Sequence, residues 1–157
     1  MNETHQQFMR EAIKLSLTNI EQNGGPFGAV IVKDGSIIAT GTNRVTANND
    51  PTAHAEITAI RAAAQKISSF DLSGCTIYTS CEPCPMCLAA IYWARIDQIF
   101  YGNTKLDAKN IGFDDSFIYD EIALPSSKRS IKTAQLIRNE AIVGFEKWAD
   151  FEGKTEY

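Results

Sequence analysis

Two short stretches of the chain place metal-ligand side chains beside a carboxylate. His54 and Glu56 are separated by one residue, and Cys84 and Cys87 are separated by two. Zinc favours imidazole nitrogen and thiolate sulfur, and catalytic zinc sites use three protein ligands and keep a fourth position for water. His54, Cys84 and Cys87 therefore predict a catalytic zinc site, with Glu56 placed to move protons beside it.

Both stretches fall where the sequence predicts that a helix begins. Cys84 lies between Pro83 and Pro85, and Cys87 follows two residues later, a pattern that suits the start of a helix. At a helix start both sulfurs would project to one side. The positive end of the helix dipole there favours thiolates. His54 also sits at a predicted helix start. Glu56 is the harder case, because residues two apart lie about 200° apart around a regular helix. Spacing alone leaves open whether Glu56 faces the same metal as His54.

Other uses of the cysteines stay open at this point. A CxxC pair in a cytosolic chain can be a redox pair. The chain has four cysteines, Cys75, Cys81, Cys84 and Cys87, so a structural four-thiolate zinc site is a second alternative. The last three are too closely spaced for the usual pair-loop-pair arrangement. A carboxylate beside the ligand histidine has no use in a structural site, which argues against a non-enzymatic zinc-binding module.

Length, composition and charge narrow the class of protein. The chain has 157 residues, 44% hydrophobic and 22% charged, which fits one ordinary folded domain over 1–157. A net charge of -4, with Lys128 and Arg129 as the nearest basic cluster, favours a small-molecule substrate and no nucleic-acid partner. No apolar run approaches the roughly 20 residues that cross a bilayer. The first twenty residues do not read as a secretory signal, so we expect a cytoplasmic protein without membrane contact.

The elements that must position these residues alternate between helix and strand. We expect helices over about 3–22, 53–66 and 83–94, and strands over 27–33, 36–42, 75–80 and 98–101. Asp34 and Gly35 predict a tight hairpin turn between the first two strands, because glycine accepts positive φ at no steric cost. Asp50 or Thr52 is expected to cap the second helix.

This order predicts an α/β fold, a three-layer α-β-α sandwich with a five-stranded mixed sheet. The fifth strand is expected within 131–138, and residues 103–131 are expected to form a short helix and a loop. Phe145, Trp148 and Ala149 have helical spacing near the end of the chain.

Four stretches resemble the cytidine and deoxycytidylate deaminase superfamily. They read GGPFGAVIVKDG over 24–35, NDPTAHAE over 49–56, YTSCEPCPMC over 78–87 and GFDDSFIY over 112–119. The H-x-E and P-C-x-x-C motifs among them are the signature of zinc deaminases that act on nucleobases. Within the superfamily the chain is most similar to bacterial guanine deaminases, for which the fourth stretch is the more specific.

The resemblance implies a cytidine deaminase-like fold and hydrolytic deamination of guanine to xanthine and ammonia, in purine catabolism or salvage. It implies one Zn²⁺ per chain on His54, Cys84 and Cys87 with a bound water or hydroxide, and proton transfer by Glu56. The substrate-binding residues that it implies, or that could enclose a flat base, are Asn43, Phe27, Asp115, Trp93 and Tyr157.

The first four of these residues also have plainer interpretations. Asn43 can be a turn residue, Phe27 and Trp93 can be core residues, and Asp115 can be an exposed helix cap. Cys75 and Cys81 are interpreted as structural, and His5 as a surface residue.

Tyr157 is the last residue of the sequence, and chain ends are normally poorly ordered. The resemblance implies instead a homodimer that exchanges C-terminal segments, about 131–157, so that Tyr157 closes the site of the neighbouring chain.

Two other deaminases on the same fold remain alternatives. A tRNA-specific adenosine deaminase usually ends in a helix rich in Arg and Lys, whereas this chain ends with mixed charge over 147–157. Deamination of cytosine or another nucleobase or nucleoside would need a pocket of different size, which the sequence does not measure.

Overall fold

The structure is a computed structural model that describes residues 3–157. The chain forms two compact units, with the boundary between Ser116 and Phe117. The first unit contains the sheet, and the second is helical in the residues that have regular structure. None of the helices described in these residues is long and apolar enough to span a membrane.

The predicted order of helices and strands in the first unit is confirmed, with small differences at the ends of the elements. The elements are α1 (Glu3–Glu21), β1 (Gly28–Lys33), β2 (Ser36–Thr42), α2 (Val45–Asn48), α3 (Ala55–Ile67), β3 (Cys75–Cys81), α4 (Pro85–Trp93), β4 (Gln98–Asn103) and α5 (Lys105–Asn110). Asp34 and Gly35 form the expected turn between β1 and β2, with φ of 50° and 72°.

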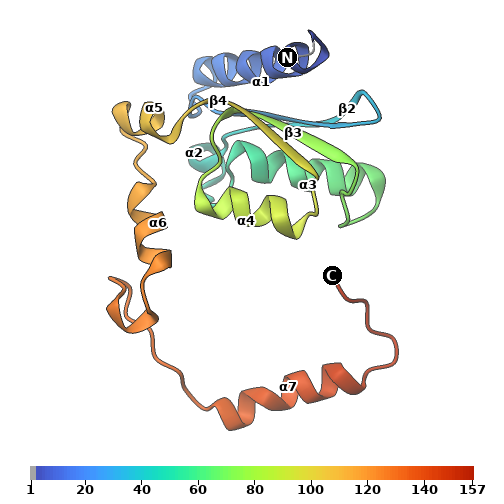
Figure 1. Cartoon of the computed structure of the whole chain (residues 1–157), viewed down its shortest axis with the longest axis vertical. Coiled ribbons are helices and arrows are strands. Elements are labelled where there is room, and N and C mark those ends of the chain that lie inside the picture. The colour runs from blue at the N-terminus through green and yellow to red at the C-terminus, as the bar shows by residue number, and fades with distance from the viewer. Residues whose placement is uncertain (1–2) are drawn as a thin grey trace. The chain divides into compact units, whose positions relative to one another are not determined.

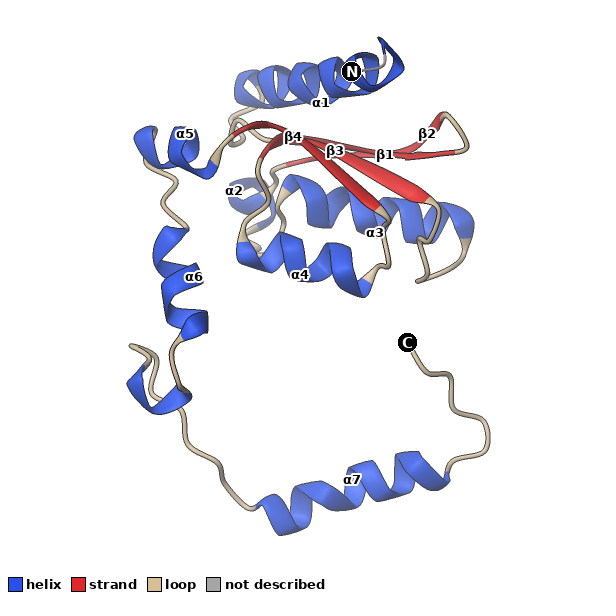
Figure 2. Ribbon diagram, viewed as in Figure 1, coloured by secondary structure: helices blue, strands red, loops and turns tan. Residues whose placement is uncertain are grey.

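The four strands described form one mixed sheet in the order β2-β1-β3-β4. β1 is antiparallel to β2 and β3, whereas β4 runs parallel to β3. A parallel pair needs a crossover connection, which α4 supplies. Helix α1 covers one face of the sheet, and α3 and α4 cover the other (Figure 1; Figure 2). The predicted three-layer α-β-α sandwich is confirmed.

Both faces of β1 are buried, so its sequence is apolar throughout rather than alternating. Ala29 and Ile31 pack in the core that includes the inner faces of α3 and α4. Val30 and Val32 point the other way and pack with Ala12 of α1. The successive residues of one strand thus fix the helical layers on both sides of the sheet.

Helix α3 lies directly on β2 at Gly41. A Cβ at Gly41 would come within 2.2 Å of the Ala55 carbonyl oxygen and 2.5 Å of the Ala59 nitrogen. We expect Gly41→Ala to lower the free energy of unfolding by about 1–3 kcal/mol, because the backbone of α3 must shift to admit the methyl group. Urea denaturation measures the change.

The matched control is Gly144→Ala, because a Cβ at Gly144 meets no atom within 4 Å. Gly144 is inside α7 (Arg138–Asp150), where alanine has the better helix propensity, so this variant should be as stable as the wild type or more stable. A Gly41→Ala protein that unfolds at the wild-type urea concentration would contradict the close packing of α3 on β2.

The predicted fifth strand is wrong in this structure. Residues 131–137 are in neither helix nor strand, and α7 starts at Arg138. A β-strand forms only where a neighbouring strand pairs with its N–H and C=O groups. In the described chain no strand pairs with the outer edge of β4. Residues 131–137 have the composition of a strand, but they do not form one because they have no partner strand.

Two helices and a 3-10 turn replace the single short helix that was expected over 103–131. They are α5, α6 (Ser116–Ala123) and the 3-10 helix Ser126–Lys128. The Arg129 guanidinium donates hydrogen bonds to the carbonyl oxygens of Glu121, Ile122 and Leu124, 3.0–3.1 Å away. Arg129 therefore caps the end of α6, and this use of its charge gives no support to a nucleic-acid surface.

Candidate active site and metal centre

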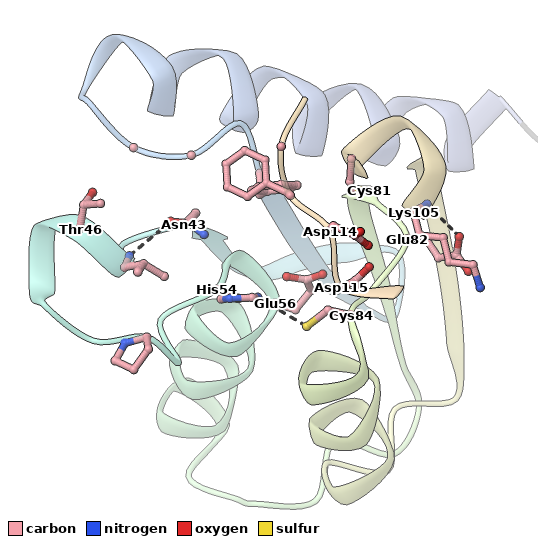
Figure 3. A pocket seen from close by; sticks show the side chains of 18 of the residues that line it. Asn43, Thr46, His54, Glu56, Cys81, Glu82, Cys84, Lys105, Asp114 and Asp115 are labelled. Carbon is pink, nitrogen blue, oxygen red and sulfur yellow. Dashed lines mark hydrogen bonds between the residues drawn. The ribbon is translucent and has the colours of Figure 1, made fainter. Parts of the chain in front are cut away.

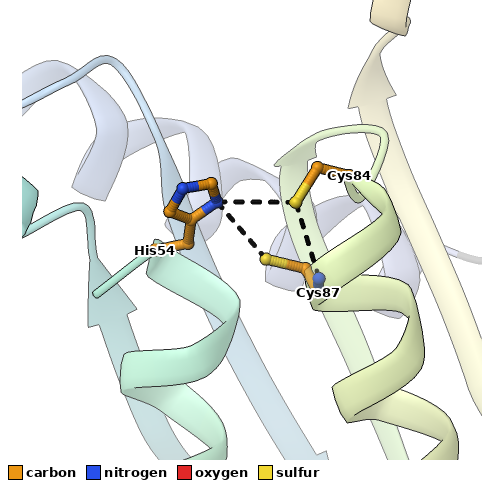
Figure 4. Close-up of side chains that lie close together, drawn as sticks. All are labelled: His54, Cys84 and Cys87. Carbon is orange, nitrogen blue, oxygen red and sulfur yellow. Dashed lines mark hydrogen bonds between the residues drawn. The ribbon is translucent and has the colours of Figure 1, made fainter. Parts of the chain in front are cut away.

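The three predicted zinc ligands lie together in the folded chain. His54 Nδ1 is 3.6 Å from Cys84 Sγ and 3.5 Å from Cys87 Sγ (Figure 4). A tetrahedral zinc ion with Zn–S of about 2.3 Å and Zn–N of about 2.0 Å places its nitrogen and sulfur ligands about 3.5 Å apart. Residue types and spacing therefore both fit zinc, and the set has three ligands, as a catalytic site requires.

Two helix N-termini meet at this centre. His54 is the N-cap of α3, with an extended backbone at φ -69° and ψ 162°, and Cys84 is the N-cap of α4, at φ -66° and ψ 168°. The Cys87 backbone N–H donates to Cys84 Sγ at 3.5 Å. Because the positive ends of both helix dipoles point at the ligands, the thiolate form is favoured.

The cap of α3 differs from the one expected from the sequence. Asp50 Oδ1 accepts hydrogen bonds from the backbone N–H and the hydroxyl of Thr52, at 2.8 and 2.7 Å, in a turn before the helix. Neither residue caps α3, because the helix starts later, after His54. This later start is what frees the imidazole for the metal site.

Glu56 shares the site with His54, which the sequence left undecided. Its side chain lines the same cavity, is 6% exposed, and accepts a hydrogen bond from the Thr79 hydroxyl at 3.3 Å. The 100° rotation per helical residue does not separate His54 from Glu56, because the backbone of His54 is extended and only Glu56 is inside the helix.

The ligands and Glu56 alter one another's pKa values. Hydrogen bonds with Cys87 and His54 lower the pKa of Cys84 to about 4, and the bond to Cys84 raises the pKa of His54. The pKa of Cys87 is raised because it is buried and bonded to Cys84, and burial raises the pKa of Glu56. His54, Cys84 and Cys87 share protons through these hydrogen bonds. A divalent cation bound by the three side chains would replace those protons.

The alternative of a four-thiolate site does not form. Cys75 and Cys81 stand at opposite ends of β3, and seven strand residues span about 20 Å. Both are buried, and the Cys81 thiol donates weakly to the Thr104 carbonyl oxygen at 3.6 Å. Burial raises the pKa of Cys81 to about 11, so this thiol stays protonated. The two side chains belong to the core and the cavity wall rather than to the metal centre.

A cavity of about 630 Å³ opens beside the triad (Figure 3). Its walls come from the loop after α1, the loop after β2, the starts of α3 and α4, and the residues that follow β4. The predicted site residues that line it are Phe27, Asn43, His54, Glu56, Cys84 and Asp115. The lining residues that sequence reasoning missed include Gly25, Thr46, Pro51, Glu82, Lys105 and Phe113.

Two aromatic rings form one wall of this cavity. Phe27 is half-buried, and its ring meets the ring of Phe113 edge-to-face, with centroids 4.9 Å apart and planes at 88°. Phe113 belongs to the 112–119 stretch that marks guanine deaminases, which was the one signal that could have identified it.

Asn43 and Asp115 provide the polar part of the lining. Asn43 is 8% exposed, and its Oδ1 accepts a hydrogen bond from the Val45 N–H at 3.3 Å. Asp115 is half-buried, and burial raises its pKa, with a further contribution from the negative charge of Cys84. Its neighbour Asp114 instead pairs with Lys109 at 3.1 Å, which holds the loop.

The remaining predicted residues lie elsewhere. Trp93 is the last residue of α4 and is 67% exposed; α4 starts at the metal centre, so its far end is about 12 Å away. Trp93 does not line the cavity of its own chain, and its role in enclosing the base stays a prediction. Tyr157 belongs to the second unit, and its role stays a prediction. His5 is half-buried rather than on the surface, with Nδ1 2.6 Å from the Tyr78 hydroxyl and its ring 4.6 Å from that of Phe100.

Comparison with known proteins places the same site in a wider set. The family model of the cytidine and deoxycytidylate deaminase zinc-binding region matches residues 2–103. The guanine deaminase of Bacillus subtilis (strain 168) is 52% identical over 154 residues, which cover 98% of this chain and 99% of that protein. The X-ray structure of a guanine deaminase from Bacillus subtilis matches this chain with a TM-score of 0.95 and 51% identity. The match covers 100% of this chain and 99% of that one.

Other relatives match a smaller share of the chain. A tRNA-specific adenosine deaminase of Aquifex aeolicus (strain VF5) is 38% identical over 118 residues, 74% of this chain and 77% of that protein. A solved structure in complex with 2,6-diaminopurine is 37% identical, with a TM-score of 0.67, and the match covers 69% of this chain and 61% of that one.

Proposed function

Because this chain belongs to the cytidine and deoxycytidylate deaminase family, we propose that it is a zinc-dependent hydrolase that converts guanine and water to xanthine and ammonia. The observation that carries this proposal is the similarity to a guanine deaminase over 98% of the chain, so that it includes the second unit as well as the metal centre. The proposal places the protein in purine catabolism or salvage. A site made of reduced thiols supports the cytoplasm as its location.

The chemistry follows from the arrangement of the chain's own groups. When bound by His54, Cys84 and Cys87, zinc supplies a Lewis acid that activates a water molecule for attack on C2 of guanine. Glu56 takes the proton of that water and delivers it to a ring nitrogen, which makes C2 electrophilic. Glu56 then takes the remaining proton of the oxygen added at C2 and delivers it to the amine, so that the C2–N bond breaks, ammonia departs and the oxygen becomes the C2 carbonyl of xanthine. Its burial against the ligands keeps both transfers short.

The cavity offers a flat base one apolar wall and two polar groups. Phe27 and Phe113 provide aromatic surface for the purine ring. The Asn43 amide can both donate and accept at the purine edge, and the Asp115 carboxylate can accept from the N–H donors that distinguish guanine from adenine. The polar groups thus supply the discrimination between bases, and the rings supply most of the buried area.

The decisive test of this function is the release of ammonia from a panel of bases. Guanine, 2,6-diaminopurine, guanosine, adenine and cytosine are each incubated with zinc-loaded protein, and xanthine is identified as the product from guanine. Turnover of guanine with no turnover of adenine supports the proposal. If another base is deaminated and guanine is not, the substrate is misassigned while the zinc chemistry stands.

The same panel with tRNA tests the nearest alternative. A tRNA deaminase would bind its substrate through phosphate contacts, so its affinity would fall steeply as salt is added. We expect neither inosine formation in tRNA nor salt-sensitive binding, since Arg129 is used to cap α6 and the cavity carries Glu82, Asp114 and Asp115 on its wall.

Asp115→Asn should raise KM for guanine by about 10- to 100-fold, the loss expected for one hydrogen bond to a charged acceptor. The change in kcat should be smaller, because the carboxylate binds the base rather than transferring a proton. Steady-state kinetics measure both. Asp120→Asn, at an exposed position of α6, is the matched control and should leave KM at the wild-type value. Equal KM values for the two variants would contradict the role of Asp115.

We also propose that the protein is a homodimer in which the second unit packs on the neighbouring chain. In α7 no residue is buried, although Phe145, Trp148 and Val143 are apolar. A helix with apolar residues that lack cover gains free energy when another surface removes them from water.

Deletion of Tyr157 tests whether the exchanged segment closes the active site. If the tyrosine ring covers the base, its removal should raise KM for guanine by up to about tenfold, because an aromatic contact contributes about 0.5–1.5 kcal/mol. Tyr157→Phe, which keeps the ring, is the control that separates the ring from the hydroxyl. A KM equal to that of the wild type would contradict the closing role.

Mixing one protein of low kcat with one of raised KM distinguishes exchange from closure within one chain. One protein carries Glu56→Gln and keeps Tyr157, and the other lacks Tyr157 and keeps Glu56. After unfolding and refolding together, mixed dimers of the exchanged type contain one complete site, so guanine turnover at low substrate concentration recovers. No recovery in dimers shown to be mixed would contradict the exchange.

A further inference from the structure

Asn19 is a buried polar residue on the sheet-facing side of α1. It is 1% exposed, and the other buried residues of this helix are Ala12 and Ser16. Burying an amide costs free energy unless its polar atoms are hydrogen-bonded. Asn19 Oδ1 has no hydrogen-bond partner among the described residues, so the hydrogen bonds of this side chain are made by its amide nitrogen.

The amide nitrogen of Asn19 joins the two loops that border the cavity. Nδ2 donates to the Gly25 carbonyl oxygen at 2.8 Å and to the Asn43 carbonyl oxygen at 2.9 Å. Both Gly25 and Asn43 line the cavity. The Gly25 oxygen also accepts from the Phe27 N–H at 2.8 Å, so one side chain outside the cavity ties together the backbone that carries two of its walls.

The loop after α1 lies directly on this amide. A Cβ at Gly24 would come within 2.2 Å of Asn19 Nδ2, and a Cβ at Gly25 would come within 3.3 Å of Asn43 Cγ. The Asn19 carbonyl oxygen accepts from the Gly24 N–H at 2.8 Å. Asn19 is therefore bonded to this loop through both its backbone and its side chain, with no space for the loop to settle closer.

We infer that Asn19 is a positioning residue for substrate binding. It acts through Asn43, whose carbonyl oxygen it binds, and through Phe27, whose N–H donates to the same Gly25 oxygen. These bonds hold the two residues in the positions that a flat base requires. A misplacement of about 1 Å by a residue that does not touch the substrate can cost about 100-fold in rate. The inference rests on the proposed function, since it assigns Asn19 to the recognition of the base at that same site.

The experiment is a double-mutant cycle with Asn19→Leu and Asn43→Ala. Leucine has the same number and branching of heavy side-chain atoms and no donor. We expect Asn19→Leu to raise KM for guanine about 10- to 100-fold, with zinc content at the wild-type value and a smaller change in kcat. If Asn19 acts through Asn43, the double variant should be little worse than Asn43→Ala alone, because the two effects are not independent.

Ser16→Ala is the matched control for packing. Ser16 is buried on the same side of α1, but its hydroxyl donates only to the Ile13 carbonyl oxygen at 2.7 Å within the helix. This variant should keep the wild-type KM even if its thermal midpoint falls. A purely structural Asn19 would behave the same way, with a lower midpoint and an unchanged KM, and that result overturns the inference. A raised KM that simply multiplies with the effect of Asn43→Ala would mean that the two residues act independently, which overturns it as well.

Asn19→Ser guards against a leucine variant that does not fold, because the shorter side chain leaves a hydroxyl that can donate one bond. It should show the same KM increase in weaker form, and an unchanged KM in this folded variant also overturns the inference. Failure of the proposed function is seen separately in the wild type, which would then not deaminate guanine. In that case the cycle is run with the base of the panel that is deaminated, and the same coupling is expected.

Discussion

Replacement of Glu56 by glutamine should lower kcat for guanine by about 10²- to 10⁴-fold, the range for loss of a general acid-base group. Glutamine has nearly the same shape but cannot take a proton from water or deliver one to the ring. Metal analysis should show the same zinc content as in the wild type, because Glu56 is not one of the three side chains that could hold the metal, His54, Cys84 and Cys87. Steady-state kinetics together with zinc quantification give both results.

The stability of the Glu56→Gln protein provides an independent check. Glu56 is 6% exposed, and burial raises its pKa, which means that the folded site disfavours the charged form. A neutral amide removes that cost, so the thermal midpoint should not fall. Glu11→Gln, at an exposed position of α1, is the control and should change neither kcat nor the midpoint. A kcat near the wild-type value for Glu56→Gln would exclude this carboxylate as the proton carrier.

Replacement of Cys84 or Cys87 by serine should remove the zinc and the activity together. A hydroxyl is a much poorer zinc ligand than a thiolate, and the remaining two protein ligands do not make a closed set. Loss of a Lewis acid worth several kcal/mol of transition-state stabilisation corresponds to about 10³-fold or more in kcat. Zinc per chain, measured after dialysis, and ammonia release from guanine are the two readouts.

The buried Cys75 supplies the matched control for these two variants. Cys75→Ala removes a thiol of the same β3–α4 region that is fully buried but is not one of the ligands. It should lower the thermal midpoint through lost packing while each chain keeps its zinc and its turnover. Full zinc content and turnover in the Cys84→Ser protein would mean that the metal centre is elsewhere.

The sequence predicted the order of elements in the first unit because their signals are local. The hairpin between β1 and β2 followed from Asp34 and Gly35, and the apolar run of β1 followed from burial on both faces. The five-strand sheet was wrong for the opposite reason. Residues 131–137 have a strand-like composition, but a strand depends on a partner edge, and no local signal specifies one.

Residue type and spacing by themselves identified the candidate metal-binding set of this protein, because zinc chemistry selects imidazole and thiolate and because the starts of α3 and α4 are marked by nearby prolines. The tertiary structure decided the rest. It placed Glu56 in the cavity by making His54 an extended cap, left Cys75 and Cys81 out of the centre, and brought Asp115 to it. The same structure placed Trp93 at the far end of α4, outside the cavity lining, and placed Asn19 against the two loops that border the cavity. Each of these outcomes depends on contacts between residues far apart in the sequence, whereas the ligand chemistry is a property of the side chains themselves.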